Sequence, residues 1–165
     1  MSKNIEILIE SEKWASARKL ILSELKKDPK NHWLLTRLST TYYEERNYKK
    51  ALQISRKASA IDPKCPLVLW DLAGTLDMLG REKEAIKIYR NLIRRGVDSI
   101  AFGECGEGLA RARGLIADCY YRLFSCYQSL GAKKTAQSFL HKHLSLRGRG
   151  CHSIYLLKEV KRKVA

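Results

Sequence analysis

The stretch that decides the fold runs from His32 to Ile100 and reads HWLLTRLSTTYYEERNYKKALQISRKASAIDPKCPLVLWDLAGTLDMLGREKEAIKIYRNLIRRGVDSI. Its apolar residues recur at intervals of three, four and seven, which is the spacing of one helix face and not the alternation of a strand. Small residues recur at a longer interval, because Ala17, Ala51 and Ala85 are each 34 residues apart. A fixed period of this length predicts similar helical units whose neighbours bury each other's apolar faces.

The recurring alanines are predicted to lie where the two helices of one unit cross. A close crossing needs small side chains, so that one helix can approach the other. Ser39 precedes Ala51 by 12 residues, and Ala73 precedes Ala85 by the same 12. The sequence therefore places a small residue on each of the two helices at the crossing.

A 34-residue period with a small residue in the second helix and a proline near the end of the unit, as at Pro29 and Pro63, resembles the tetratricopeptide repeat (TPR). The resemblance implies an all-α, TPR-like right-handed α-solenoid of antiparallel helix pairs that ends in a C-terminal capping helix. We expect a single domain over residues 1–165. Its expected parts are a partial N-terminal repeat at 1–30, repeats at 31–64, 65–98 and 114–148, an insertion at 99–113, and the capping helix at 149–165.

The insertion is placed by a break in the period. The next equivalent small residue is Ala136, which lies 51 residues after Ala85 and so 17 more than one period. Residues 98–108 contain three glycines and are predicted as a loop. Residues 109–113 are good helix formers and should extend the following helix backwards to about Gly108. The last helix is expected over 152–164.

The net charge of +15 is unusual and is unevenly distributed. Residues 101–165 hold 12 Lys and Arg against only 4 Asp and Glu. A basic surface attracts nucleic acid or acidic proteins. In the TPR resemblance the second helices form the convex back, and in the first two full repeats these helices carry much of the Lys and Arg. The basic back is therefore the expected place for a nucleic acid or an acidic protein.

Several function classes find no support in the sequence. Cys105, Cys151 and His152 have no short zinc-ligand spacing, so no metal is expected. The glycines at 103, 106 and 108 lack the lysine of a phosphate loop, and no cofactor is expected. No motif indicates an enzyme. Five cysteines without paired spacing and no apolar run of membrane length indicate a cytoplasmic protein that does not bind membrane.

The function that remains is protein binding, as an adaptor or scaffold that holds a peptide or helical segment of a partner in a concave groove. The resemblance implies that the first helix of each repeat lines this groove. A chaperone for a secreted protein and a basic helical-repeat RNA-binding protein stay open as alternatives. The candidate groove residues are Trp33, Arg37, Thr40, Tyr43, Trp70, Asp71, Asp77, Tyr121, Arg122 and Ser125.

Overall fold

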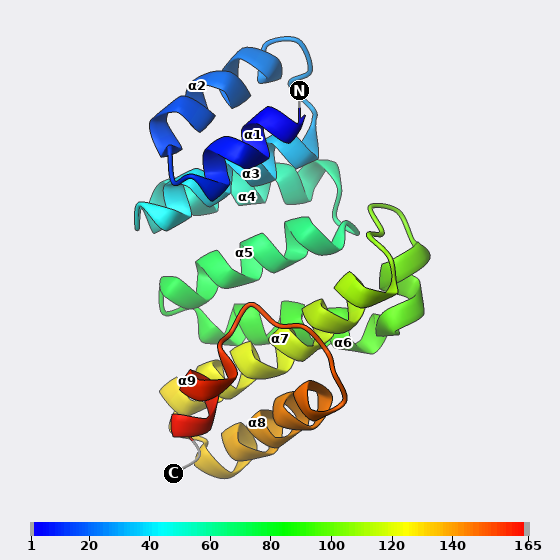
Figure 1. The fold of residues 1–165 in the computed structure, drawn as a ribbon. Coiled ribbons are helices and arrows are strands. Elements are labelled where there is room, and N and C mark those ends of the chain that lie inside the picture. The colour runs from blue at the N-terminus through cyan, green and yellow to red at the C-terminus, as the bar shows by residue number, and fades with distance from the viewer. Residues whose placement is uncertain (1, 164–165) are drawn as a thin grey trace. The chain divides into compact units, whose positions relative to one another are not determined.

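Helices form all the regular secondary structure of residues 2–163, the part of the chain that the computed structural model describes. They fall into two units, the first ending at Gly80 and the second beginning at Arg81. The first unit contains α1 (Ser2–Glu10), α2 (Trp14–Leu25), α3 (His32–Glu44), α4 (Tyr48–Ile61) and α5 (Pro66–Met78) (Figure 1). The second unit contains α6 (Glu82–Phe102), α7 (Leu109–Ser129), α8 (Lys133–Gly148) and α9 (Leu157–Arg162).

The helix starts in the first unit follow from side chains that cap them. The Asn31 side chain accepts a hydrogen bond from the backbone N–H of Leu34 at 3.0 Å. Asn47 does the same for Lys50 at 3.2 Å. Each bond satisfies one N–H that the first turn of a helix leaves without a partner. Pro66 opens α5 at a position where its missing N–H costs no hydrogen bond.

The close crossing predicted for the first full repeat is confirmed. Ala51 on α4 is fully buried, and so is Ser39 on α3. The Ser39 hydroxyl donates to the Ala51 carbonyl oxygen at 3.2 Å, so a single small side chain separates the two backbones. Ala17, Ala85 and Ala136 are also buried, as the period predicts.

Of the two N-terminal helices, α2 packs against α3, and α1 packs against α2. Ile5 and Ile21 are both buried between helices. Arg18 on α2 donates twice to the carboxylate of Glu45, at 2.7 and 3.0 Å, and lies 5.0 Å over the Tyr42 ring. These contacts fix α2 against the end of α3.

The loop predicted for residues 98–108 is wrong at its N-terminal end, because residues 98–102 continue α6. Gly96 breaks the helix with a φ of +78°, a conformation that glycine adopts without strain, and the chain then re-enters a helical turn. That turn is stabilised by apolar residues at helical spacing, which pack onto the first half of α7. The buried members of the cluster are Ile100, Ala101, Ala112 and Ile116.

The helix predicted over 152–164 is also wrong at its start, and its last residue, Val164, lies outside the described residues. Residues 151–156 are not helical, and α9 begins only at Leu157. Ile154 is 70% exposed and not on a buried face, whereas Val160 is fully buried. The reason is a set of contacts between the 151–156 segment and α7, described below, which replaces intrahelical hydrogen bonds.

Among the described residues, none of the helices combines the length and the apolar character that crossing a membrane would require.

The Ala51 crossing gives a direct test of the repeat register. Ala51→Leu should lower the free energy of unfolding by about 1–3 kcal/mol, because three extra heavy atoms must fit between two backbones that are already in contact. Ala60→Leu is the matched control, since Ala60 lies on the same helix and is exposed. Urea denaturation of both variants measures the difference. Equal stabilities would contradict the crossing.

Candidate partner-binding surfaces

Consecutive first helices bring five of the candidate groove residues onto neighbouring elements of the first unit. Helix α3 contacts α5 directly. Helix α3 carries Trp33, Arg37 and Thr40, and α5 carries Trp70 and Asp71. All five are half-buried, so each retains some surface for a partner.

Arg37 is held in place on this surface by two contacts. Its Nε donates to the Glu6 carboxylate on α1 at 2.6 Å, and its guanidinium lies 5.4 Å from the centre of the Trp33 ring. A cation over an indole face is attracted to the ring. The hydrogen bond to the Glu6 carboxylate further restricts the orientation of the Arg37 guanidinium group. The result is a preorganised pair of one aromatic and one cationic side chain. The sequence did not predict Glu6, because nothing in the repeat pattern indicates which residue of the shortened α1 reaches α3.

Asp71 is the chemically distinctive residue of this surface. Its Oδ2 atom is buried and has no hydrogen-bond partner among the described residues. Burial raises the pKa of Asp71 to about 7, while the Ser39 hydroxyl and the Arg37 charge act to lower it. Near neutral pH this carboxyl group can therefore either accept or donate a hydrogen bond.

The other candidates of the first unit lie in less distinctive surroundings. The Thr40 hydroxyl donates to the Thr36 carbonyl oxygen of its own helix at 3.1 Å. Tyr43 packs edge-to-face against Tyr48, with ring centres 5.3 Å apart, and so lies beside the α3–α4 turn. Asp77 is half-buried in the last turn of α5.

In the second unit, the chain covers its own candidate surface. Residues 151–156, which we call the C-terminal strap, lie against α7 (Figure 1). Asp118 on α7 accepts a hydrogen bond from the backbone N–H of Ile154 at 3.2 Å. The Tyr155 ring packs 4.1 Å from the ring of Tyr121. Tyr121 is thereby only 8% exposed, and the expectation that it is open to a partner is wrong.

Polar groups under the strap are partly satisfied by it. Burial raises the pKa of Asp118, whereas hydrogen bonds from Ser153 and Ile154 and the nearby His143 and Arg147 lower it. His143 is fully buried, and its Nδ1 lies 2.7 Å from the Ala117 carbonyl oxygen. The strap therefore supplies an N–H and an O–H donor to the Asp118 carboxylate, which would have fewer hydrogen bonds without it.

The two remaining candidates of the second unit differ from Tyr121. The Nε of Arg122 donates to the Tyr89 hydroxyl at 3.1 Å and so links α7 to α6. Ser125 is half-buried on α7. Sequence reasoning missed Tyr155 as the residue that covers this face, since a helix was expected where the strap lies.

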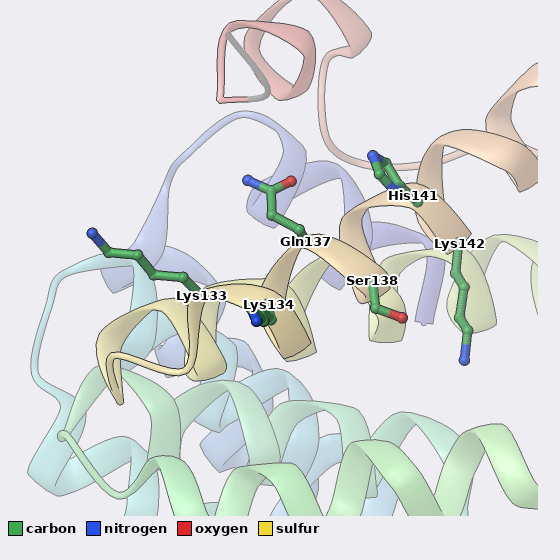
Figure 2. A pocket seen from close by; sticks show the side chains of 6 residues that line it. All are labelled: Lys133, Lys134, Gln137, Ser138, His141 and Lys142. Carbon is green, nitrogen blue, oxygen red and sulfur yellow. The ribbon is translucent and has the colours of Figure 1, made fainter.

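A basic surface that the sequence analysis did not single out runs along α8. Figure 2 shows six of its side chains along the helix. They line an open hollow of about 680 Å³. All six come from one helix, so they form an open face that cannot enclose a small molecule. They are Lys133, Lys134, Gln137, Ser138, His141 and Lys142.

Next to this face lies a row of stacked aromatic rings. Phe139 on α8 stacks with Tyr127 on α7 at 5.4 Å and with Tyr120 at 6.2 Å. Arg90 and Lys142 lie over the Phe139 ring at 5.8 and 5.4 Å. Cations are attracted to aromatic rings, so positive charge lies close to this stack.

Comparison with known proteins agrees with this architecture. Residues 42–102 match the family model of the tetratricopeptide repeat. Over these residues the chain is similar to tetratricopeptide repeats. No curated protein sequence matches the chain.

Solved structures extend the likeness beyond the matched residues. MamA MSR-1 is 21% identical with a TM-score of 0.63, over 87% of this chain and 72% of the MamA chain. A second MamA structure has 21% sequence identity and a TM-score of 0.64, over 87% of this chain and 69% of the MamA chain. YrrB, a TPR protein with an unusual peptide-binding site, has 17% sequence identity and a TM-score of 0.51, over 87% of this chain and 83% of the YrrB chain. The predicted all-α TPR fold class is confirmed.

The raised pKa of Asp71 predicts a specific dependence of stability on pH. The folded state binds the Asp71 proton more tightly than the unfolded state does. The contribution of this proton to the free energy of unfolding is therefore complete below pH 4 and is lost as the pH rises through about 7. Asp71→Asn should remove this decline, which is on the order of a few kcal/mol. The exposed control Asp98→Asn should keep it. Urea denaturation at pH 5 and pH 8 provides the comparison, and a decline that persists in Asp71→Asn would contradict it.

The strap makes a second prediction. Tyr155→Ala should destabilise the second unit by on the order of 1–3 kcal/mol and speed amide exchange in the strap, because the contact with Tyr121 is lost. Ile154→Ala is the neighbouring control, since that side chain is 70% exposed. Thermal melts and hydrogen exchange give the two readouts. A Tyr155 variant as stable as the Ile154 variant would mean that the strap contributes little to packing.

Proposed function

We propose that the protein is an adaptor that binds an extended segment of a partner protein on the surface formed by α3 and α5. The observation that carries the proposal is the buried Oδ2 of Asp71, which has no partner among the described residues. Such an atom costs free energy, which a ligand N–H recovers once the Asp71 side chain turns towards the surface. An extended peptide supplies N–H donors along its whole backbone.

The residues around Asp71 suit the same ligand. Trp33 and Trp70 offer large, rigid apolar area at low entropic cost, and such residues are common anchors at interfaces. Arg37 is fixed by Glu6 and Trp33, so little ordering is left to occur when a partner binds. YrrB, which shares the fold, has a peptide-binding site, and this supports the same mode of binding here.

The first unit is the preferred location, because the corresponding face of α7 already holds a segment of extended chain. The strap places Tyr155 and the Ile154 N–H against Tyr121 and Asp118. These contacts are of the kind that a bound peptide would make. We assign partner binding to the α3–α5 surface, because the strap already occupies the face of α7.

A second candidate function is supported by the basic face of α8. Three lysines and a histidine line the hollow there, with Phe139 and Tyr127 beside it. Phosphates bind such a face through charge, and bases can stack on aromatic rings. Salt separates the two candidates. Nucleic acid binding should weaken steeply between about 50 and 200 mM salt, whereas peptide binding on α3–α5 should change little.

The adaptor proposal is tested with a library of random linear peptides displayed on phage, selected against the full chain. Trp33→Ala and Trp70→Ala should each weaken the selected peptides by about tenfold or more, because anchor residues carry most of the binding energy. Trp14→Ala is the matched control, since Trp14 is also half-buried but lies on α2. Calorimetry at two salt concentrations measures the affinities. Selected peptides that bind all three variants with unchanged affinity would refute the α3–α5 site.

A further inference from the structure

Three side chains with metal-binding atoms meet at one corner of the first unit. His32 begins α3, Asp62 follows α4, and Cys65 directly precedes α5. Their imidazole nitrogen, carboxylate oxygen and sulfur atoms all lie within 4.8 Å of one another. His32 Nε2 and Asp62 Oδ2 are 3.7 Å apart. Ligands bonded to a tetrahedral zinc ion at about 2.0–2.3 Å lie roughly 3.3–3.8 Å from each other, so small side-chain movements would close this set on an ion.

The repeat architecture explains why these residues meet. The period brings the start of α3 next to the loop that enters α5, because consecutive first helices are neighbours. Within that loop, Asp62 Oδ1 accepts hydrogen bonds from the backbone N–H groups of Lys64 at 3.0 Å and Cys65 at 2.9 Å. These two bonds fix the carboxylate and turn Oδ2 towards His32. Hydrogen bonds of this kind orient metal ligands in proteins.

The low exposure of the three side chains also favours binding of a cation. Asp62 is 8% exposed and Cys65 only 2%, while His32 is half-buried. In such surroundings a carboxylate and a thiolate attract a divalent cation more strongly than they would in water. A His32–Asp62 ion pair explains the positions of two of the three side chains. It gives no reason for the thiol group of Cys65 to lie beside them.

We propose that His32, Asp62 and Cys65 bind a zinc ion. Imidazole and thiolate together favour zinc over magnesium or calcium, which prefer oxygen ligands alone. A tetrahedral ion takes one donor beyond these three, either a water molecule or another side chain. Binding requires the Cys65 thiolate and a neutral His32, so it should release protons. The ion would join the start of α3 to the α4–α5 loop, a role independent of the α3–α5 peptide surface.

No sequence motif indicates this site. Its ligands are separated by 30 and 3 residues, and only Asp62 and Cys65 are close in the chain. Zinc motifs are recognised by short pairs of cysteine or histidine, and this set has none. The absence of a motif, which led to the expectation of no metal, therefore does not bear on a set that packing assembles.

The test is a titration of the full-length, chelator-treated protein with Co²⁺, which reports thiolate ligation through a charge-transfer band in the near ultraviolet. We expect the band at one equivalent of Co²⁺ and its loss when Zn²⁺ is added. Cys65→Ser should abolish the band. His32→Ala should weaken Co²⁺ binding by at least about tenfold, the lower bound for even the loss of a group that only orients a ligand.

Two further variants keep the result interpretable. Asp62→Asn retains an oxygen that can accept from Lys64 and Cys65, so the loop keeps its hydrogen bonds while the anionic ligand is lost, and affinity should fall. Cys151→Ser, at a half-buried cysteine of the second unit, should leave the band unchanged. The proposal is overturned if the wild-type protein shows no thiolate band, or if the band survives in Cys65→Ser. Loss of the band in Cys151→Ser would overturn it equally.

Discussion

The first unit depends on the close approach of α3 and α4 at Ser39 and Ala51. The hydroxyl group of Ser39 bonds to the Ala51 carbonyl oxygen at 3.2 Å, so no larger side chain fits between the backbones. This distance sets how far apart the helices of the pair lie. It thereby lets α3 pack beside α5, the next first helix, and the candidate surface is a consequence of that arrangement. Ser39 also lies close to Asp71, so the same small residue serves both the packing and the electrostatics of the surface.

Two buried carboxyl groups show how similar helix faces acquire different roles. Burial raises the pKa of both Asp71 and Asp118. The C-terminal strap donates hydrogen bonds to Asp118 and stacks Tyr155 on Tyr121, so this face of α7 is occupied by the chain itself. Each residue keeps one buried oxygen without a hydrogen-bond partner among the described residues, Oδ2 in Asp71 and Oδ1 in Asp118. The two faces therefore differ in the strap that covers α7 and not in the hydrogen bonding of their carboxyl groups.

The basic face of α8 and the cluster of metal-binding side chains lie in different parts of the chain. The lysines of α8 lie on an open face beside stacked rings, and they suit long-range attraction of an acidic or phosphate-bearing partner. His32, Asp62 and Cys65 lie in a mostly buried corner, where a bound ion would act on local structure. A partner surface, a basic face and a metal site can coexist because each uses different residues of the repeat.

The sequence by itself determined the helical class, the 34-residue register and the buried small residues at the crossings, because these follow from local periodicity and side-chain volume. The caps at Asn31 and Asn47 also depend only on neighbours three residues away. Only the tertiary structure decided that residues 98–102 continue α6, that the strap covers Tyr121, and that His32 meets Cys65. These features depend on contacts between residues far apart in the chain, and no periodic pattern records which distant groups will satisfy a buried carboxylate or cover an exposed ring.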